Sequence, residues 1–491
     1  MSTQTLADLR AGSYLGVKKI KLANDDLHSF PSEILTLSKT LEILDLSNNP
    51  HLSTLPASIS QLTNLKIAFF SSCSFQQFPS ALALCPALEM VAFKDNGMKR
   101  IEEGSLPRKL RWLILTGNQL ETLPHDVAEC ARLEKCMLAG NRLRAMPEGL
   151  RMCRKLGLLR VACNEIKDVP EWIWSMPELA FFSVAGNPCC DGSSEKESSG
   201  QSDDLEDIPW EDLTVQHLLG KGASGIISQA LWKRTSSLSV SKQTTFKDSG
   251  YNTPISQSGT STPALQVTHD KVAIKIFHGT LTSDGSPLSE LEACIAVGQH
   301  ANVISSLGTI TSHPSSSPGL VLELIPASYK NLGLPPSFTT CTRDVFDEQE
   351  IKGKLDVAAV MGILKGIAKA MMHLHARNVA HGDLYAHNIL VDVARNRAVL
   401  GDFGAATLYK NLFVSSDGGS EGDGKRYERL EVLAFAHLVE DMIGCCAWNV
   451  EGYESEGRLL EALCRLWRDC CCPVVERRPG FGEVVEALKA L

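Results

Sequence analysis

The sequence predicts an α/β repeat solenoid followed by a two-lobed α+β domain. A nine-residue pattern, L-x-x-L-x-L-x-x-N, recurs through the first part of the chain, and such a fixed period is the signature of a stacked solenoid. The second half instead carries a glycine-rich motif and, further on, acidic motifs. A stretch rich in Ser, Gly and acidic residues, with little to bury, separates the two. We therefore expect a repeat domain at 15–188, a flexible acidic linker at 189–211 and a second domain at 212–491.

The composition is that of an ordinary globular protein and excludes several classes. Of the 491 residues, 44% are hydrophobic and 21% are charged, which argues against wholesale disorder, a collagen repeat and a small disulfide scaffold. Asp and Glu number 57 against 48 for Lys and Arg, so the formal net charge is −9. A diffuse negative charge disfavours nonspecific binding to nucleic acid or anionic membranes. We expect no nucleic-acid partner.

The N-terminus and the cysteines favour a reducing compartment. The first residues, MSTQTLADLRAGSYLG, show neither a basic-then-apolar leader nor a small-residue cleavage site. No run approaches the roughly 20 uninterrupted apolar residues that span a bilayer. The 16 cysteines are then expected to be buried thiols, because adjacent cysteines such as Cys470, Cys471 and Cys472 lack the second pair that completes a metal site. We expect a cytoplasmic protein without a membrane span.

Eight copies of the repeat pattern stand in one register. They start at Val17, Leu41, Leu65, Leu88, Leu110, Leu133, Leu156 and Leu179, at intervals of 22–24 residues. The apolar positions of each copy are expected to stack on their equivalents in a continuous core, and the asparagines to satisfy backbone groups where each strand turns. Over roughly residues 15–188 the chain resembles the leucine-rich repeat family. The resemblance implies a binding module, and the asparagines are expected to be structural.

The residues between the repeat leucines are expected to line the concave side of the solenoid. Eight of these are large and apolar: Ile67, Phe69, Met90, Trp112, Ile114, Met137, Leu158 and Phe181. A solvent-facing surface this apolar is typical of a protein contact. The partner is either another protein or the second half of this chain. The alternative is that the register slips in the weaker repeats and some of these residues are core.

The second domain carries a set of motifs in a defined order. These are G-x-G-x-x-G at Gly220, Gly222 and Gly225, Val272-Ala273-Ile274-Lys275, His381-Gly382-Asp383, Asn388 and Asp402-Phe403-Gly404. The apolar residues after the glycines predict a strand, whereas a dinucleotide fold would place a helix there. With this order and length, residues 212–491 resemble the protein-kinase domain, and the C-terminal ERRPGFGEVVEAL resembles the end of tyrosine-kinase-like domains.

This resemblance implies a site for ATP and Mg²⁺. Lys275 supplies positive charge to the α- and β-phosphates, Asp383 takes the proton of the acceptor hydroxyl, and Asn388 and Asp402 hold Mg²⁺. As the acidic partner of Lys275 we favour Glu292 over Glu290, because Glu292 falls closer to the usual spacing. The other implied nucleotide-binding residues are Leu219, Gly220, Lys221, Gly222, Gly225, Ile227, Ala273, Glu323, Leu324 and Leu390.

The catalytic loop departs from the family pattern at three positions. Gly382 replaces an arginine, Tyr385 replaces the lysine of serine/threonine kinases, and His387 replaces the arginine of many tyrosine kinases. A missing cation removes electrostatic stabilisation of the transition state. Two hypotheses stay open. The favoured one is an active ATP-dependent serine/threonine kinase whose repeats recruit a substrate or regulator. The other is a pseudokinase scaffold in which nucleotide binding gates partner binding by the repeats.

Two further segments are unusual. No A-P-E motif follows Asp402, only 26 residues separate Gly404 from Glu431, and Glu431 is expected at the start of the large C-terminal helix. This puts peptide-substrate selection in doubt. An insertion at about 235–268 is rich in Ser and Thr and is expected to be disordered, either as a phosphorylation target or as a passive loop.

Overall fold

A computed structural model describes residues 5–191, 205–237, 265–413, 424–449 and 454–491. The chain forms two compact units. Unit 1 combines residues 1–204, 279–305 and 326–491, and unit 2 combines 205–278 with 306–325. The repeats therefore share one unit with most of the second domain, which differs from a division at the linker.

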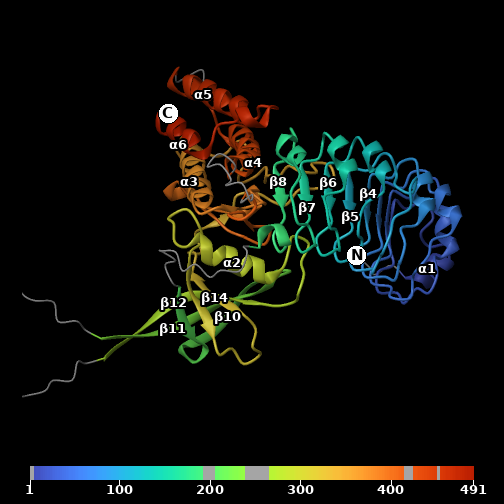
Figure 1. The fold of residues 1–491 in the computed structure, drawn as a ribbon, viewed down its shortest axis with the longest axis horizontal. Coiled ribbons are helices and arrows are strands. Elements are labelled where there is room, and N and C mark those ends of the chain that lie inside the picture. The colour runs from blue at the N-terminus through green and yellow to red at the C-terminus, as the bar shows by residue number, and fades with distance from the viewer. Residues whose placement is uncertain (1–4, 192–204, 238–264, 414–423, 450–453) are drawn as a thin grey trace, which may run out of the picture. The chain divides into compact units, whose positions relative to one another are not determined.

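The repeats of unit 1 form one parallel sheet of eight three-residue strands, ordered as in the chain (Figure 1). The strands are β1 Lys19–Lys21, β2 Ile43–Asp45, β3 Ile67–Phe69, β4 Met90–Ala92, β5 Trp112–Ile114, β6 Lys135–Met137, β7 Leu158–Arg160 and β8 Phe181–Ser183. Each begins two residues after its predicted start, so the register of all eight copies is confirmed. A short helix, α1 at Leu6–Arg10, precedes them.

Prolines and asparagines shape the turns of the repeats. Six prolines recur along the repeats, and each stands immediately before a short 3-10 helix: Pro31, Pro56, Pro79, Pro124, Pro147 and Pro170. Fully buried Asn49 accepts the backbone N–H of Leu27 at 2.9 Å and donates to the carbonyl of Leu22, and the later asparagines repeat this arrangement. The predicted asparagine ladder is present.

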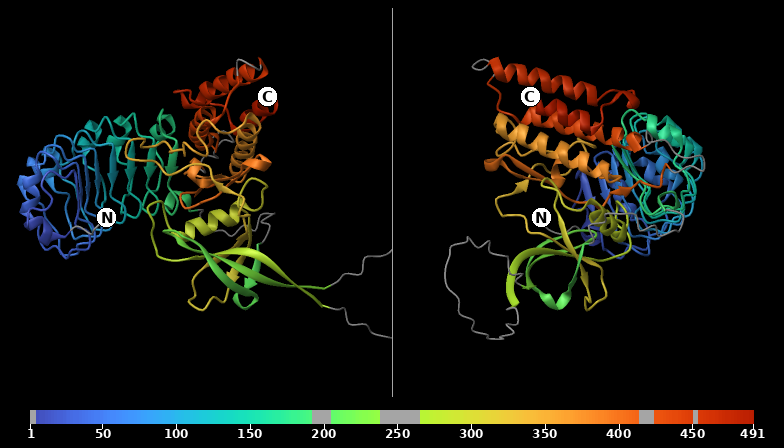
Figure 2. Two further views of the ribbon diagram at one scale, coloured as in Figure 1. Left: turned by 180° about the vertical axis from the view of Figure 1, so that it is seen from behind. Right: turned by 60° about the vertical axis from the view of Figure 1, so that its left-hand side comes forward.

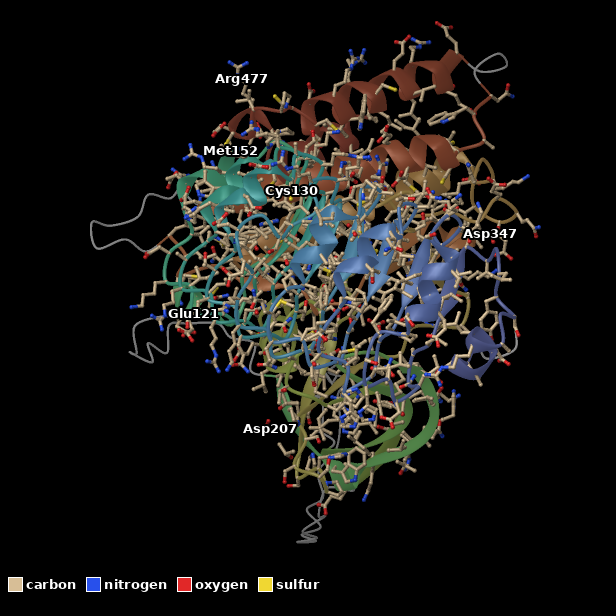
Figure 3. All side chains as sticks on the ribbon, turned by 90° about the vertical axis from the view of Figure 1, so that its right-hand side faces the viewer. Glu121, Cys130, Met152, Asp207, Asp347 and Arg477 are labelled. Atoms are coloured by element: carbon tan, nitrogen blue, oxygen red, sulfur yellow. The ribbon has the colours of Figure 1, made fainter. Side chains whose placement is uncertain are left out.

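The thiols of the chain are not paired. All 16 cysteines are free, and Cys130 lies inside the repeats, whereas Met152 projects at their surface (Figure 3). Burial raises the pKa of the Cys130 thiol to about 12, so this cysteine remains a neutral, small hydrophobic group near neutral pH.

The remainder of unit 1 is mainly helical. Its helices are α2 Pro287–Val297, α3 Val357–Ala376, α4 Gly424–Cys445, α5 Glu454–Cys470 and α6 Phe481–Lys489, and the last four run alongside one another (Figure 2). Its short strands are β15 Lys330–Asn331, β16 Val379–Ala380, β17 Ile389–Asp392, β18 Arg397–Leu400 and β19 Thr407–Leu408. Among the described residues, only α3 is long and apolar enough to cross a bilayer, and 61% of its apolar window is buried in the fold.

Unit 2 is a six-stranded sheet with the order β10-β11-β12-β14-β13-β9. Its strands are β9 Glu206–Pro209, β10 Leu213–Lys221, β11 Gly225–Ser237, β12 Leu265–Phe277, β13 Ser306–Thr311 and β14 Gly319–Glu323. The sheet is antiparallel except where β9 pairs with β13. Its core contains Trp232, Ile274 and Val321.

Three predicted boundaries need correction. The linker does not extend to residue 211, because Glu206–Pro209 pair with β13 and bury Ile208. Glu431 lies inside α4, which already begins at Gly424. The predicted insertion is shorter at both ends, since β11 runs to Ser237 and β12 starts at Leu265; its remainder, 238–264, lies outside the described residues.

A histidine in α4 makes the stability of unit 1 depend on pH. Burial lowers the pKa of His437 to about 3, and the charges of Arg343 and Arg478 add to this effect. Below pH 6.5 the unfolded chain binds a proton at His437, whereas the folded chain keeps this histidine neutral. The free energy of unfolding is therefore unaffected by His437 above pH 6.5 and decreases as the pH falls below it. At 1.4 kcal/mol per pH unit, we expect a loss of about 2 kcal/mol by pH 5.

Urea unfolding at pH 7.5 and pH 5 tests this expectation when the wild type is compared with His437→Gln. The variant should gain about 2 kcal/mol relative to the wild type on going to pH 5, because it has no proton to bind. A difference between the two proteins that does not change with pH would contradict the assignment.

Candidate catalytic site

The loop between β16 and β17 holds Asp383 and Asn388, and Asp402 follows β18. Asn388 Nδ2 donates hydrogen bonds to Asp383 at Oδ2 (2.8 Å) and at the backbone carbonyl (2.9 Å). The backbone N–H of Gly401, the residue before Asp402, donates to the carbonyl of Asn388 at 3.0 Å. Asp402 adopts a left-handed φ of 58° and accepts from the N–H of Gly404. Asn388 is thus hydrogen-bonded to Asp383, and its carbonyl contacts the residue before Asp402. Carboxylate and amide oxygens are ligand types that suit Mg²⁺.

Histidine and glutamate hold the backbone of this loop. The N–H of Asp383 donates to His381 Nδ1 at 3.2 Å, while His381 Nε2 donates to the Gly401 carbonyl. Glu431 of α4, only 1% exposed, accepts the N–H groups of His381 and Gly382 at 3.1 and 2.5 Å. Burial alone would raise the pKa of Glu431, but hydrogen bonds, first of all that from His375, outweigh burial and lower the pKa. The buried Glu431 carboxylate therefore holds the backbone of the catalytic loop in place.

The carboxyl group of Asp383 lies in a field of mixed charges. Its Oδ1 accepts from Nη2 of Arg160, a residue of β7 in the repeats. Burial raises the pKa of Asp383, the nearby carboxylates Asp284 and Asp402 raise it further, and Arg160 opposes both effects. The repeats thus contribute directly to the electrostatics of the loop.

Unit 2 carries the other predicted residues. Gly220 and Lys221 of β10 pair with Ile227 and Ile226 of β11, so the glycine motif forms the hairpin that the sequence predicts. A Cβ on Gly225 would approach the Ile276 carbonyl to 2.6 Å, and this close approach explains the glycine. Lys275 lies on β12 with its Nζ 5.0 Å from the Phe277 ring centre.

The remaining positions predicted for the nucleotide are also on regular elements. Ala273 lies on β12 opposite Leu322 of β14, Glu323 ends β14, and Leu324 follows. Leu219 is on β10 and is 46% exposed, while Gly222 donates its N–H to the Gly225 carbonyl in the turn. Leu390 belongs to unit 1, on β17.

The choice of Glu292 over Glu290 as the acidic partner of Lys275 stays a prediction, but the two glutamates differ in burial. Both lie on α2, but Glu290 is 3% exposed and Glu292 is exposed to solvent. A Cβ placed on Gly404 would lie 3.9 Å from Glu290 Oε2, so Glu290 faces the Asp402–Gly404 turn. Spacing along the sequence alone did not distinguish the two faces of a helix whose acids are two residues apart, about 200° around its axis.

Two family profiles match the chain. The family described as protein tyrosine and serine/threonine kinase matches residues 213–434, and the leucine-rich repeat family matches residues 40–62. The chain combines leucine-rich repeats with a protein kinase domain. Asp383, Asn388 and Asp402 all lie within the matched part of the kinase domain.

Known kinases resemble the chain over short segments. A kinase and exchange factor for Rac A from Dictyostelium discoideum is 40% identical over 12% of this chain and 5% of its own length. A probable serine/threonine-protein kinase of Arabidopsis thaliana is 31% identical over 23% of this chain and 13% of its own, and fibroblast growth factor receptor 2 of Dugesia japonica is 27% identical over 42% and 20%. The chain therefore spans a fifth or less of the length of these relatives.

The concave side of the repeats packs against the kinase domain. Leu158 and Phe181 are buried in one hydrophobic core with α3 and α4, and Met137 packs against it. The ring of Phe181 stacks on Tyr385 with centres 4.0 Å apart, and Trp112 Nε1 donates to Cys341 Sγ. At these residues the partner of the concave surface is the second half of the same chain, which is one of the two alternatives drawn from the sequence.

The other predicted surface residues differ among themselves. Ile67 and Met90 are buried, so the expectation of an exposed apolar surface is wrong at these two positions. Leu158 and Phe181 are also buried, but in the core that they share with the kinase domain. Phe69 and Ile114 are half-buried. Neighbouring strands of a sheet lie only about 4.8 Å apart, so large side chains on the concave face cover one another.

Two of the unusual catalytic-loop residues contact the repeats. Gly382 has a left-handed φ of 73°, and a Cβ there would lie 2.5 Å from the Ala405 carbonyl and 3.0 Å from that of Phe182. Tyr385 carries the ring on which Phe181 stacks. The third, His387, contacts Asp344 at 2.7 Å; burial lowers its pKa, but the Asp344 carboxylate outweighs burial and raises it.

The residue that sequence reasoning missed is Arg160. It is the third residue of β7, equivalent to Phe69, Ile114 and Met137, so the repeat register already places it on the concave side. Selecting only apolar residues for that surface left it out. An arginine at a concave position of the repeat register was the available signal.

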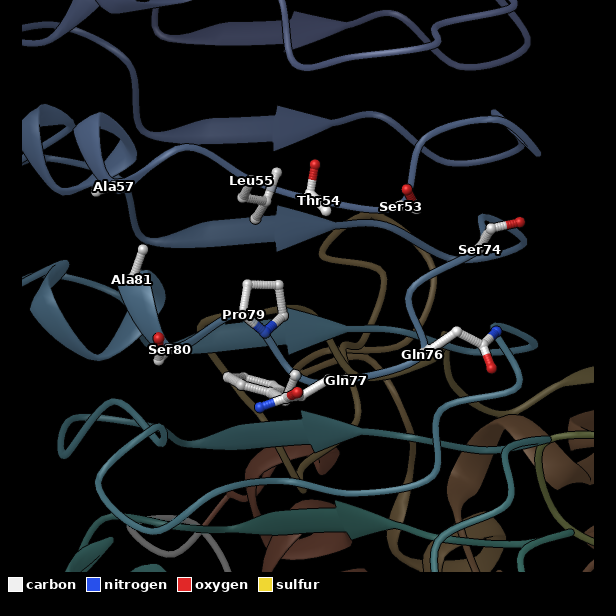
Figure 4. Close-up of a pocket in the computed structure, with 11 residues that line it drawn as sticks. Ser53, Thr54, Leu55, Ala57, Ser74, Gln76, Gln77, Pro79, Ser80 and Ala81 are labelled. Atoms are coloured by element: carbon white, nitrogen blue, oxygen red, sulfur yellow. The ribbon is translucent and has the colours of Figure 1, made fainter.

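A separate groove of the repeats is lined without acidic or basic side chains (Figure 4). Its lining consists of Ser53, Thr54, Leu55, Ala57, Ser74, Gln76, Gln77, Phe78, Pro79, Ser80 and Ala81. These side chains include no group that titrates near neutral pH, so the groove offers neither an acid nor a base.

Proposed function

We propose that the chain is an ATP-dependent protein kinase that transfers the γ-phosphate to serine or threonine hydroxyls. The observation that carries the proposal is the arrangement of Asp383 and Asn388, joined at 2.8 Å, beside Asp402. Asp383 would accept the proton of the acceptor hydroxyl, while Asn388 and Asp402 would hold Mg²⁺, which neutralises charge on the phosphates. Lys275 and the glycine hairpin of unit 2 supply the groups that kinases use to bind the triphosphate.

The choice of serine or threonine is supported by relatives. The Arabidopsis protein is named a serine/threonine kinase, as is a Raf homologue of Caenorhabditis elegans that is 35% identical over 60 residues. Free cysteines throughout the described chain support a reducing compartment, for which we propose the cytoplasm. We further propose that the concave residues not engaged by the kinase domain, Phe69 among them, recruit a substrate or regulator.

Incubation of the full chain with Mg²⁺ and γ-labelled ATP tests the activity. We expect label on the chain itself and on a generic acceptor protein, with phosphate mapped by mass spectrometry to Ser and Thr. Addition of EDTA should abolish transfer, because the carboxylates cannot hold the phosphates without the cation. Label on Tyr alone would correct the specificity. An absence of transfer with ATP still bound would favour the scaffold alternative.

A further inference from the structure

Arg160 connects the repeats to the catalytic aspartate. It ends β7, its side chain is 0% exposed, and its Nε lies 3.0 Å from Asp284 Oδ1 while its Nη2 donates to Asp383 Oδ1. Asp284 belongs to the segment that leads into α2. One guanidinium therefore holds carboxylates from two parts of the kinase domain.

The catalytic loop itself contributes no comparable cation. Tyr385 is neutral and is stacked between Phe181 and His387, whose ring centres lie 4.0 and 5.1 Å away. The charge of His387 is directed at Asp344. Asp383 meanwhile faces the like charges of Asp284 and Asp402, and Arg160 is the cation that contacts it directly. His387 of the same loop and Lys135 of the repeats add positive charge from further away.

A gain in folding stability does not explain why an arginine is buried at position 160. A buried ion pair recovers its desolvation cost poorly, and apolar residues that replace all of its partners together are often as stable. The Nη1 of Arg160 is also buried and has no hydrogen-bond partner among the described residues. An unsatisfied buried donor is unfavourable, which points to a functional reason for keeping the charge.

The contact around Arg160 is built like a permanent interface. The core of the repeats continues into Tyr409, Tyr427 and Leu430 of the kinase domain. Tyr427 donates its hydroxyl to the Phe182 carbonyl at 2.9 Å, and the N–H of Val184 donates to Thr407 Oγ1 at 3.2 Å. Continuous apolar cores of this kind are typical of obligate interfaces, so Arg160 stays at the site.

We propose that Arg160 is a positioning residue of the phosphotransfer site, supplied by the seventh repeat in place of the cation that the catalytic loop lacks. The inference rests on the proposed kinase activity. In that reaction the acceptor oxygen bonds to the γ-phosphorus, the bond from this phosphorus to the β–γ bridging oxygen breaks, ADP departs, and the hydroxyl proton passes to Asp383. Arg160 holds the carboxylate of Asp383 in orientation while Asn388 holds its other oxygen.

Steady-state kinetics of Arg160→Met and Arg160→Lys in the full chain test the inference. Below its thermal midpoint, we expect Arg160→Met to lower kcat about a hundredfold, as removal of a single charged donor does in other sites, with KM for ATP little changed. Its thermal midpoint should also fall, because Asp383 and Asp284 lose their buried cation. Arg160→Lys should restore about a tenth of kcat, since it keeps the charge but not the two-pronged geometry. The matched control is Arg111→Met, which removes a repeat arginine that donates to the Phe338 carbonyl of the kinase domain, and it should stay within about twofold.

The outcomes are distinct. An unchanged kcat in Arg160→Met, or a kcat above that of the wild type, overturns the inference, and an increase would make the repeats inhibitory. If Arg160→Met does not fold, Arg160→Lys decides, and a kcat equal to the wild type overturns the inference. A wild-type protein that transfers no phosphate overturns the proposed function and this inference with it, whereas an active wild type with an indifferent Arg160 overturns only the latter.

Discussion

The Asp383→Asn variant is expected to lose about a thousandfold in phosphoryl transfer while it keeps its fold and its affinity for ATP. The loss has two sources. An amide cannot accept the proton of the acceptor hydroxyl. It also cannot satisfy both of its neighbours, because Arg160 Nη2 and Asn388 Nδ2 are donors and an amide offers one oxygen and one further donor. One neighbour must therefore face an N–H group.

The measurement compares initial rates of transfer with nucleotide binding by titration. The matched control is Glu348→Gln, which removes a carboxylate from the exposed surface of the same unit, where Glu348 is 81% exposed beside Lys352. This control should transfer phosphate at the wild-type rate. A rate for Asp383→Asn within tenfold of the wild type would show that another group takes the proton, and weaker ATP binding would assign Asp383 a role in holding the nucleotide.

The repeat half of the fold could be predicted almost completely from the sequence. Its period of 22–24 residues is set by contacts between neighbouring repeats. The eight strand positions, the prolines and the buried asparagines such as Asn141 follow from that local rule. The catalytic-loop residues were predictable for a different reason, since Asp383 and Asn388 are five residues apart and their contact is local.

What could not be predicted depends on contacts between distant segments. Arg160 and Asp383 are separated by 223 residues, and nothing in the spacing of either motif indicates that they meet. The burial of Glu290 and the exposure of Glu292 depend on which face α2 turns toward the Asp402–Gly404 turn. Strand β9 forms because it pairs with β13, about a hundred residues further along the chain, and Ile208 is buried there. The acidic composition around Ile208 gives no sign of this pairing.

Gly382 connects the unusual catalytic loop to the repeats, and its replacement tests that connection. Gly382→Arg restores the residue that resemblance to kinases leads one to expect, yet we expect it to destabilise unit 1 by about 3 kcal/mol and not to raise activity. A left-handed backbone costs a side chain about 1–2 kcal/mol, and overpacking costs a further 1–3 kcal/mol. The nearer clash, with the Ala405 carbonyl, lies within the kinase domain, and the second, with the Phe182 carbonyl, lies at the contact with the repeats.

Thermal and urea unfolding of three variants separate these contributions. Gly382→Ala adds only the Cβ and should already account for most of the loss, because the Cβ is the atom that meets the Ala405 carbonyl at 2.5 Å. The matched control is Gly444→Ala in α4, where a Cβ meets nothing within 4 Å and should stabilise the helix by about 1 kcal/mol. Wild-type stability in Gly382→Arg would show that the repeats can withdraw from the catalytic loop, in which case the glycine would not be needed for their contact. A destabilised Gly382→Arg beside a stabilised Gly444→Ala would instead show that the catalytic loop needs glycine at this left-handed position, between the carbonyls of Ala405 and of Phe182 in the repeats.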